Sequence, residues 1–261
     1  KRVNIMPEEI ESLIGLLILL VFCIVAVLVI FGKKIRSRKL QGLATSLGYT
    51  FSEADENFLK LNPNLRTLHE APETTCYHFI QGQNGPASTT FCEMDYMVTV
   101  MGNQAQASRS VILIKHSELN LPHFYIFREN PMMKMGGMVK DAGSQLAEGL
   151  QEAGVEVFGT TQTTDNGAPP LNTWASSGGI KLASHPKLNK KHGVQSTAAQ
   201  NLNAFLDNTM VEAIIESGDT TWEGCGNVLV LCSNHKKWSV GQIKEYLEHS
   251  QCFLTAALAK N

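Results

Sequence analysis

The feature that most limits what this chain can fold into is a long uncharged run near its N-terminus. Residues 13–32 contain no charged side chain, and only Gly15 and Gly32 among them are neither strongly apolar nor alanine. As a helix rising about 1.5 Å per residue, the run would measure roughly 30 Å, the thickness of a bilayer's hydrocarbon core. A buried helix of this length in a soluble protein normally carries a polar stripe, and the apolar core of a secretory signal is only about 7–15 residues long. We therefore expect residues 13–32 to form a single transmembrane helix.

The charges on either side of this run predict its orientation. Three glutamates precede it and five basic residues follow it, although Lys1 and Arg2 reduce the contrast. Short flanking segments rich in Lys and Arg are retained in the cytoplasm. We therefore expect residues 1–12 to be extracytoplasmic and the large domain to lie on the cytoplasmic side of a bacterial inner membrane. The five basic residues would also contact anionic lipid headgroups at the membrane surface; they are Lys33, Lys34, Arg36, Arg38 and Lys39.

The chain beyond the basic residues is acidic. After Leu40 it carries 15 Lys and Arg residues against 21 Asp and Glu residues. A domain that binds nucleic acid needs a basic face to neutralise phosphates, so we expect no nucleic-acid partner. The six cysteines are scattered along the chain, which is typical of reduced thiols rather than a disulfide framework. Were the domain extracytoplasmic, Cys225 and Cys232 would be the first pair to examine.

The first part of the domain has the pattern of an antiparallel sheet. Residues 33–48 predict a basic juxtamembrane helix that ends at Gly48, a residue type common just after helix C-termini. Residues 49–130 predict a β region, because apolar residues alternate along several short runs. The tripeptide NGP at residues 84–86 separates two such runs and predicts a hairpin turn. The runs RSVILIKH and FYIFRE follow after short links, which favours antiparallel pairing.

Residues 181–261 are expected to complete the domain with helices and a second hairpin. Apolar spacing predicts a helix over residues 201–217, and residues 224–227 form the expected turn of the hairpin. Ser239 and Gln242 have the spacing of a capping box, which predicts an amphipathic helix that begins there and ends near Ala259. The expected fold class is α+β: a single N-terminal transmembrane helix, then an antiparallel-sheet soluble domain with packed helices and a C-terminal amphipathic helix.

Between these two parts, residues 131–180 predict a Met-rich helix followed by a flexible insertion. The Gly, Thr, Asn and Pro content after residue 158 is typical of an exposed loop. Methionine side chains suit adaptable apolar contacts, so this segment is a candidate site for binding a partner, although core packing is the alternative role. The methionines concerned are Met132, Met133, Met135 and Met138.

No motif in the chain names a reaction. We find no phosphate-binding loop, no nucleophile elbow and no metal-ligand spacing, so we expect no catalytic residue, metal or cofactor. Cys76 and His78 would share a face of a regular strand, which indicates a core thiol beside a half-exposed histidine. A basic turn is a candidate anion site, although charged turns are usually only solvated; its members are His185, Lys187, Lys190, Lys191 and His192.

The order of these features resembles that of a set of bacterial proteins in which a single-span anchor precedes a small α+β domain. The similar pieces are KKIRSRKLQGLATSLGYTFS, TTFCEMDY, LPHFYIFRE, FLDNTMVEAIIE and WEGCGNVLVL. They cover most of the chain outside residues 131–180. The resemblance implies a fold but no known activity and no catalytic residues. Residues 131–180 look longer than the corresponding link in that set, which makes them the expected place for a protein-specific interaction.

These features together favour a non-catalytic accessory or assembly subunit of a larger bacterial membrane complex. The expected partners are other integral membrane proteins and anionic lipid headgroups. The uncharged run has no G-x-x-x-G pattern, so homodimerisation is not indicated. The alternative is a membrane-tethered enzyme or small-ligand sensor with a site in the cytoplasmic domain.

Overall fold

A computed structural model describes residues 8–69, 71, 73–100, 103–128, 180–197, 199–234 and 236–260. The expected Met-rich helix and insertion at residues 131–180, apart from Ile180, lie outside the described residues. So do the four methionines that we named as candidates for binding a partner.

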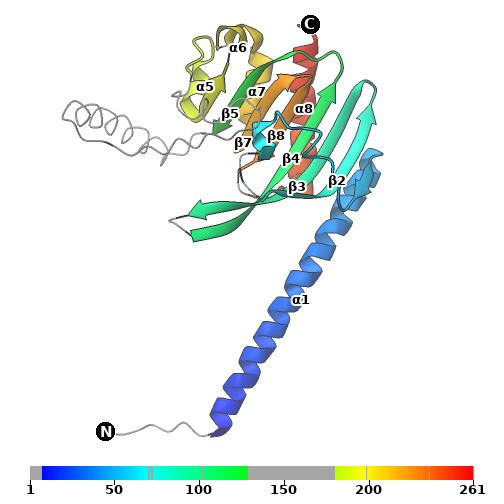
Figure 1. The fold of residues 1–261 in the computed structure, drawn as a ribbon, viewed down its shortest axis with the longest axis vertical. Coiled ribbons are helices and arrows are strands. Elements are labelled where there is room, and N and C mark those ends of the chain that lie inside the picture. The colour runs from blue at the N-terminus through cyan, green and yellow to red at the C-terminus, as the bar shows by residue number, and fades with distance from the viewer. Residues whose placement is uncertain are drawn as a thin grey trace, which may run out of the picture.

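The chain begins with one uninterrupted helix, α1 (Glu8–Leu47), of 40 residues. Most of α1 projects away from the domain as a straight rod, and only its C-terminal end reaches the sheet (Figure 1). There, Leu40, Leu43 and Ala44 recur at helical spacing and are all buried in the core. Gly48 follows with φ 71°, a left-handed conformation that glycine adopts without strain and that ends the helix. The helix predicted over residues 33–48 is the last part of α1, which continues into it without a break from the uncharged run.

The projecting part of α1 exposes apolar side chains. Residues 16–22 are all Leu, Ile, Val or Phe, and each is between 52% and 72% exposed. Among the residues whose side chains the structure describes, no helix is long and apolar enough to cross a membrane.

The strands of the described part of the chain form a single sheet in which every pairing is antiparallel. Their order is β1-β2-β3-β4-β8-β7-β5-β6, so β5 does not pair with β4 but lies beyond the β7–β8 hairpin. This confirms the expected α+β class with an antiparallel sheet. The strands are β1 (Thr50–Ser52), β2 (Thr75–Asn84), β3 (Ala87–Val100), β4 (Asn103–His116), β5 (Leu121–Arg128), β6 (His192–Ser196), β7 (Thr220–Gly226) and β8 (Val228–Ser233).

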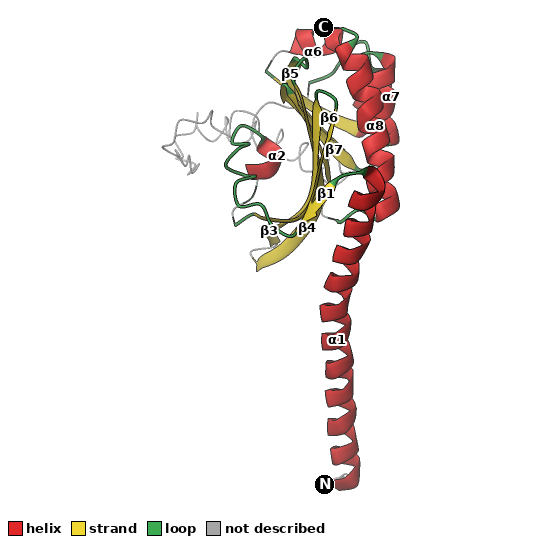
Figure 2. Ribbon diagram, turned by 90° about the vertical axis from the view of Figure 1, so that its right-hand side faces the viewer, coloured by secondary structure: helices red, strands yellow, loops and turns green. Residues whose placement is uncertain are grey.

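The sheet has a core on each face. Figure 2 shows α7, α8 and the end of α1 against one face, and α2 against the other. Alternation along the strands supplies both cores: Phe91 points to the helical face and Cys92 to the opposite face. The helices are α2 (Arg66–His69), α5 (Pro186–Lys191), α6 (Ala199–Phe205), α7 (Asn208–Glu216) and α8 (Val240–Leu258).

Several local predictions are confirmed. The turn after Asn84 contains Gly85 at φ 59°, and the β7–β8 turn follows Gly226 at φ 57°. The capping box is present: the Ser239 hydroxyl accepts from the Gln242 amide N–H, while the Gln242 side chain accepts from the Ser239 amide N–H.

Two local predictions were wrong. The single helix over residues 201–217 is two helices, because the Asp207 carboxylate accepts from the Met210 amide N–H at 2.9 Å and so caps the start of α7. The basic turn near residue 190 is also more ordered than expected. It forms the short helix α5 and then the edge strand β6, which pairs with β5.

Candidate functional site

A cavity of about 860 Å³ lies where α1 reaches the domain. One wall comes from α1, and the others come from β2, β3, β4 and the segment between β8 and α8. Eight of the sixteen lining residues carry charged side chains, four basic and four acidic. The lining residues are Gly32, Lys33, Lys34, Arg36, Ser37, Glu53, Glu73, Thr75, Tyr77, His78, Glu93, Asp95, Tyr96, Met97, Gln106 and Lys237.

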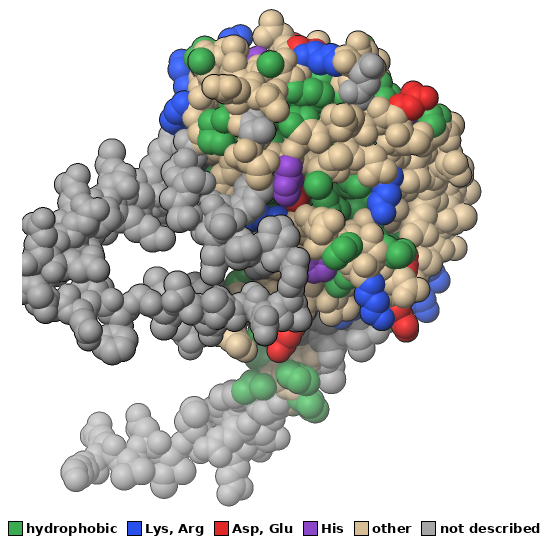
Figure 3. Space-filling model, turned by 45° about the horizontal axis from the view of Figure 1, so that its top comes forward, with side chains coloured by type: hydrophobic (Ala, Val, Ile, Leu, Met, Phe, Trp, Pro, Cys, Tyr) green, Lys and Arg blue, Asp and Glu red, His purple; other side chains and the backbone are tan. Residues whose placement is uncertain are grey.

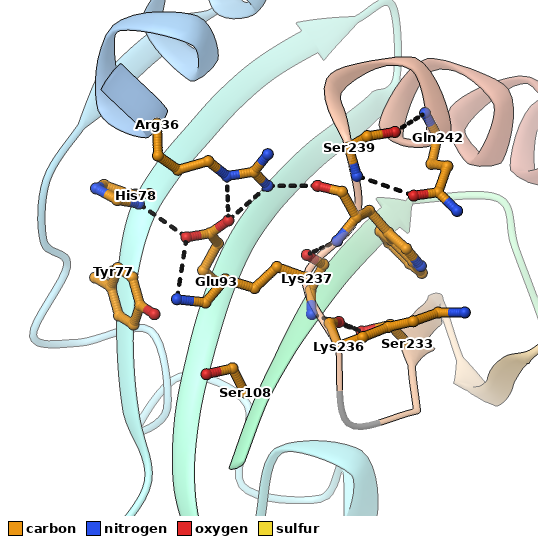
Figure 4. A network of polar contacts seen from close by, with 12 residues as sticks. Arg36, Tyr77, His78, Glu93, Ser108, Ser233, Lys236, Lys237, Ser239 and Gln242 are labelled. Atoms are coloured by element: carbon orange, nitrogen blue, oxygen red, sulfur yellow. Dashed lines mark hydrogen bonds and ion pairs between the residues drawn. The ribbon is translucent and has the colours of Figure 1, made fainter. Parts of the chain in front are cut away.

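Glu93 is the centre of this site. It lies on β3, on the face that also carries Phe91, and its side chain is 0% exposed. The Arg36 guanidinium donates from Nε to Glu93 Oε1 at 2.8 Å, with Nη2 2.6 Å away from the same oxygen. The second carboxylate oxygen of Glu93 is 2.9 Å from His78 Nδ1 and 3.9 Å from Lys237 Nζ (Figure 4). A buried carboxylate needs such partners because desolvation without them would cost several kcal/mol.

Arg36 joins three parts of the fold. It lies on α1, binds Glu93 on β3, and donates from Nη2 to the Trp238 carbonyl at 2.5 Å. Trp238 directly precedes Ser239, the N-cap of α8, and its indole is buried against Tyr246 with ring centroids 4.5 Å apart. The last part of α1 is therefore tied to the sheet and to the start of α8 by one side chain (Figure 4).

His78 reaches Glu93 because β2 contains a bulge. The register of β2 against β3 shifts between Tyr77 and Ile80, and His78 has φ 54°, a left-handed conformation that is uncommon for a residue with a side chain. As a result, the Tyr77 hydroxyl reaches Asp95 and the His78 ring reaches Glu93, both on the helical face of the sheet. The rings of Tyr77 and His78 pack edge to face. The expectation that Cys76 and His78 share a face was wrong, because Cys76 packs in the opposite core.

The second ring nitrogen of His78 also faces a carboxylate. Nε2 is 3.3 Å from Glu53 Oε2, and Glu53 Oε1 accepts from the Ser37 hydroxyl on α1 at 2.5 Å. His78 thus lies between two carboxylates, with Nδ1 facing Glu93 and Nε2 facing Glu53.

Asp95 is the second internal carboxylate and is bound mainly by neutral donors. Its Oδ1 accepts from the Tyr77 hydroxyl at 2.8 Å and from the Ser108 hydroxyl at 2.6 Å. Gln106 Nε2 donates to Oδ2 at 3.3 Å, and Lys237 Nζ stands 3.8 Å from Oδ1. Burial and the hydrogen bond to Asp95 both raise the pKa of Tyr77, so this phenol stays protonated and acts as a donor.

Glu223 is a buried carboxylate with a structural role. It lies on β7 on the opposite face of the sheet and accepts from the amide N–H groups of Arg66 and Thr67, both at 2.8 Å. The Thr67 hydroxyl donates to it as well. These donors include the first residues of α2, so Glu223 holds this short helix against the sheet as a cap supplied from elsewhere in the chain.

The structure separates the basic residues predicted to contact the membrane surface into two groups. Arg36 is turned inward, with its side chain 21% exposed and bound to Glu93. The others are exposed: Lys33 and Lys34 line the cavity, whereas Arg38 and Lys39 do not. Their contact with lipid headgroups stays a prediction.

The residues of the candidate anion site around α5 differ in exposure, and anion binding there stays a prediction. His185 and His192 are buried, and His185 Nε2 contacts the Leu206 carbonyl at 3.1 Å. Lys187, Lys190 and Lys191 are exposed. Burial lowers the pKa of His192, which favours its neutral form and does not favour an anion.

The described cysteines are free thiols. In the β7–β8 hairpin, Cys225 lies opposite Val228 and Cys232 lies opposite Thr221, so the two cysteines do not face each other. Burial raises the pKa of Cys92 and of Cys225, which disfavours the reactive thiolate. Within the described residues, no group of three His, Cys, Asp or Glu side chains could hold a metal ion. The face in Figure 3 carries dispersed charges of both signs among its described residues.

Reasoning from the sequence missed Glu93, Asp95, Tyr77 and Lys237. The signal was present in FCEMDY, because Glu93 and Asp95 alternate with Cys92 and Met94 and so must share a face with Phe91. A carboxylate at an inward strand position requires a buried partner.

In comparisons with known proteins, the chain matches no family model, no curated protein and no solved structure.

Proposed function

We propose that this protein is a non-catalytic accessory subunit of a bacterial membrane complex. Residues 13–32 of α1 anchor it in the inner membrane, residues 1–12 lie outside, and the α+β domain lies on the cytoplasmic side. Its partners are other integral membrane proteins and anionic lipid headgroups.

The observation that carries this proposal is the division of α1 into two halves. Residues 16–22 expose a continuous apolar surface, which is unfavourable in water and favourable in hydrocarbon or against another apolar helix. The other half is fixed to the domain by Arg36 and by the buried Leu40 and Leu43. An anchor without a break between span and domain holds the domain in one orientation, which suits a subunit that positions or stabilises its neighbours.

The interior of the cavity also supports a structural role. The two inner carboxylates, Glu93 and Asp95, are bound by fixed donors from the protein itself. Neither of them is therefore poised as a free general base. The same charged cavity is the observation that favours the alternative, a membrane-tethered sensor or enzyme whose site is there. A thermal-shift screen of the full chain with small metabolites distinguishes the two roles, because a strongly stabilising substrate would favour the alternative.

Purification from native membranes in a mild detergent tests the proposal. The tagged full chain is expected to elute as a large assembly with at least one integral membrane protein in constant ratio. A matched variant with the order of residues 16–22 scrambled keeps the same hydropathy. It should remain in the membrane fraction and lose the contacts that depend on helix packing. A monomer that carries no membrane protein would contradict the proposal.

The proposed sidedness has its own test, because the thiols differ in exposure. Cys252 on α8 is exposed, whereas Cys92 and Cys232 are buried. A membrane-impermeant maleimide should label Cys252 in inverted inner-membrane vesicles and leave it unlabelled in intact spheroplasts, with the two buried thiols as internal controls. Labelling in spheroplasts would reverse the orientation.

A further inference from the structure

The cavity beside α1 contains two inner carboxylates that accept hydrogen bonds from the protein. It also contains three lysine ammonium groups, of which only Lys237 has ionic partners among the described residues, both at long distance. Glu93 accepts from Arg36 and His78, and Asp95 accepts from Tyr77, Ser108 and Gln106. A ligand that brought further donors would find these two carboxylates occupied. The chemistry that remains available in the interior is that of hydrogen-bond donation.

Three lysines supply this donor capacity. Lys33 and Lys34 are exposed residues in the α1 wall, and neither forms an ion pair with any other described residue. Lys237 Nζ stands 3.9 Å from Glu93 and 3.8 Å from Asp95. These separations exceed the roughly 2.7–2.9 Å of a charge-assisted hydrogen bond, so the N–H groups of Lys237 can still bind a ligand.

The position of the cavity along α1 indicates the source of an anion. Its lining begins at Gly32, the last residue of the uncharged run, and continues through Lys33 and Lys34. This step rests on the proposed membrane anchor: when residues 13–32 span the hydrocarbon core, the cavity lies at the depth of the lipid phosphates.

We propose that the cavity is a binding site for a phosphate ester, supplied by a phospholipid headgroup and held by the ammonium groups of Lys33, Lys34 and Lys237. The site would select one lipid within the cavity, which differs from the general attraction of a basic segment to an anionic surface. The exposed Arg38 and Lys39 on the same helix lie outside the lining and contribute only to that general attraction.

Two exposed carboxylates, Glu53 and Glu73, also line the cavity and would oppose phosphate binding. Glu53 is engaged by Ser37 and His78. Glu73 is exposed and lines the cavity, and it forms no ion pair within the described residues. Its negative charge would repel a bound phosphate, so Glu73→Gln should tighten binding.

Native mass spectrometry of the full chain in a phosphate-free detergent tests the site. Phosphatidylglycerol is titrated in, with diacylglycerol as a probe that has the same chains and no phosphate. We expect one phosphatidylglycerol to bind in preference to diacylglycerol. The double variant K33Q/K34Q should bind it at least about tenfold more weakly, since two charge-assisted hydrogen bonds are lost, and E73Q should bind it more tightly.

The control is R38Q/K39Q, which removes the same charge from the same helix outside the cavity. This control should retain most of the wild-type affinity for phosphatidylglycerol. All variants should unfold at the wild-type temperature, because the substituted side chains are exposed. Equal losses in the two double variants, or equal binding of diacylglycerol, would overturn the proposal. Glycerol phosphate and inorganic phosphate form a second arm: if either binds with the same dependence on Lys33 and Lys34, the phosphate site is supported and its source is soluble.

Failure of this inference is distinguishable from failure of the anchor. Carbonate extraction of the same cells reports whether the chain is integral to the membrane. A chain that resists extraction but binds no phosphatidylglycerol contradicts the cavity proposal alone. A chain released by carbonate contradicts the anchor.

Discussion

At the scale of single residues, Glu93 is a buried charge whose partners come from distant parts of the chain. Arg36 is 57 positions away and His78 is 15. Removing one member of a buried ion pair leaves the other uncompensated, which is costly, whereas replacing both by apolar residues is often tolerated. The end of α1 therefore packs stably on the sheet only when Arg36 is paired with the Glu93 carboxylate.

Glu93→Gln should destabilise the domain by about 3 kcal/mol, because Arg36 and His78 would then face a neutral amide in a buried site. The measurement is denaturant-induced unfolding of the full chain in detergent. Glu53→Gln is the matched control: its side chain is 66% exposed, so the expected loss is about 0.5 kcal/mol. The double variant R36M/E93L should recover much of the stability. Equal effects of the two Glu→Gln changes would contradict this account of the site.

His192 should make the domain sensitive to mild acid. Burial lowers its pKa in the folded protein, so below about pH 6.5 the unfolded chain binds a proton that the folded chain does not. The free energy of unfolding therefore falls as the pH drops through this region. His192→Gln removes the titration, and its denaturation midpoint should fall less between pH 7 and pH 5.5 than that of the wild type. Parallel curves for the two proteins would show that His192 is not responsible.

At the scale of elements, local signals decided where helices and turns begin and end. The Ser239–Gln242 capping box and the glycine turns at Gly85 and Gly226 have short-range chemistry that the sequence displays directly. The break at Asp207 was missed because apolar spacing continues across it, from Leu202 and Phe205 to Met210 and Ile214. A capping residue inside an apolar pattern therefore weighs more than the periodicity around it.

Asp207→Ala should destabilise the protein by about 1 kcal/mol, because the Met210 amide N–H at the start of α7 loses its acceptor. Asp207→Asn is the control, since asparagine caps about as well as aspartate. It removes only the longer ion pair with Lys260, at 3.8 Å and partly exposed. Thermal unfolding of the three proteins provides the measurement. A loss in the Asn variant as large as that in the Ala variant would indicate that charge, not capping, matters at this position.

The site and the strand order could not be predicted in the same way, because both depend on contacts between distant residues. The contact of Arg36 with the Trp238 carbonyl spans 202 positions. The pairing of β4 with β8, in which Ile112 opposes Leu231, is not encoded by alternation within either strand. The bulge at His78 is equally hidden, since the sequence around it reads as a regular strand and only the pairing with β3 exposes the extra residue.

At the scale of the whole molecule, α1 connects a projecting apolar half to a domain without an intervening loop. Residues along an α-helix rotate by about 100° and rise about 1.5 Å each. The number of helical residues between residues 16–22 and Arg36 therefore sets the orientation of the domain relative to any partner bound along residues 16–22.

Insertion of two alanines after Phe31 should rotate the domain by about 200° relative to the projecting half of α1, while seven alanines restore the angle to within about 20°. If the proposed membrane partners bind along residues 16–22, the first variant should lose them on purification and the second should retain more of them. Unfolding of the domain should be the same in both, because the insertions precede Arg36. Equal retention of partners in the two variants would show that the angle is unimportant.

The strand order has one more consequence, at the place where the chain leaves and rejoins the sheet around residues 129–179. Arg128 ends β5 opposite His192, and the amide N–H of Ile180 donates to the Val194 carbonyl at 2.7 Å. Both junctions thus lie beside the same short strand, β6. Closing a longer connection between neighbouring points costs little additional entropy, so a folded reporter such as a fluorescent protein could replace this connection and leave the sheet intact. The same connection can be enlarged or exchanged without disturbing the buried end of α1 or the cavity that β2, β3 and β4 line.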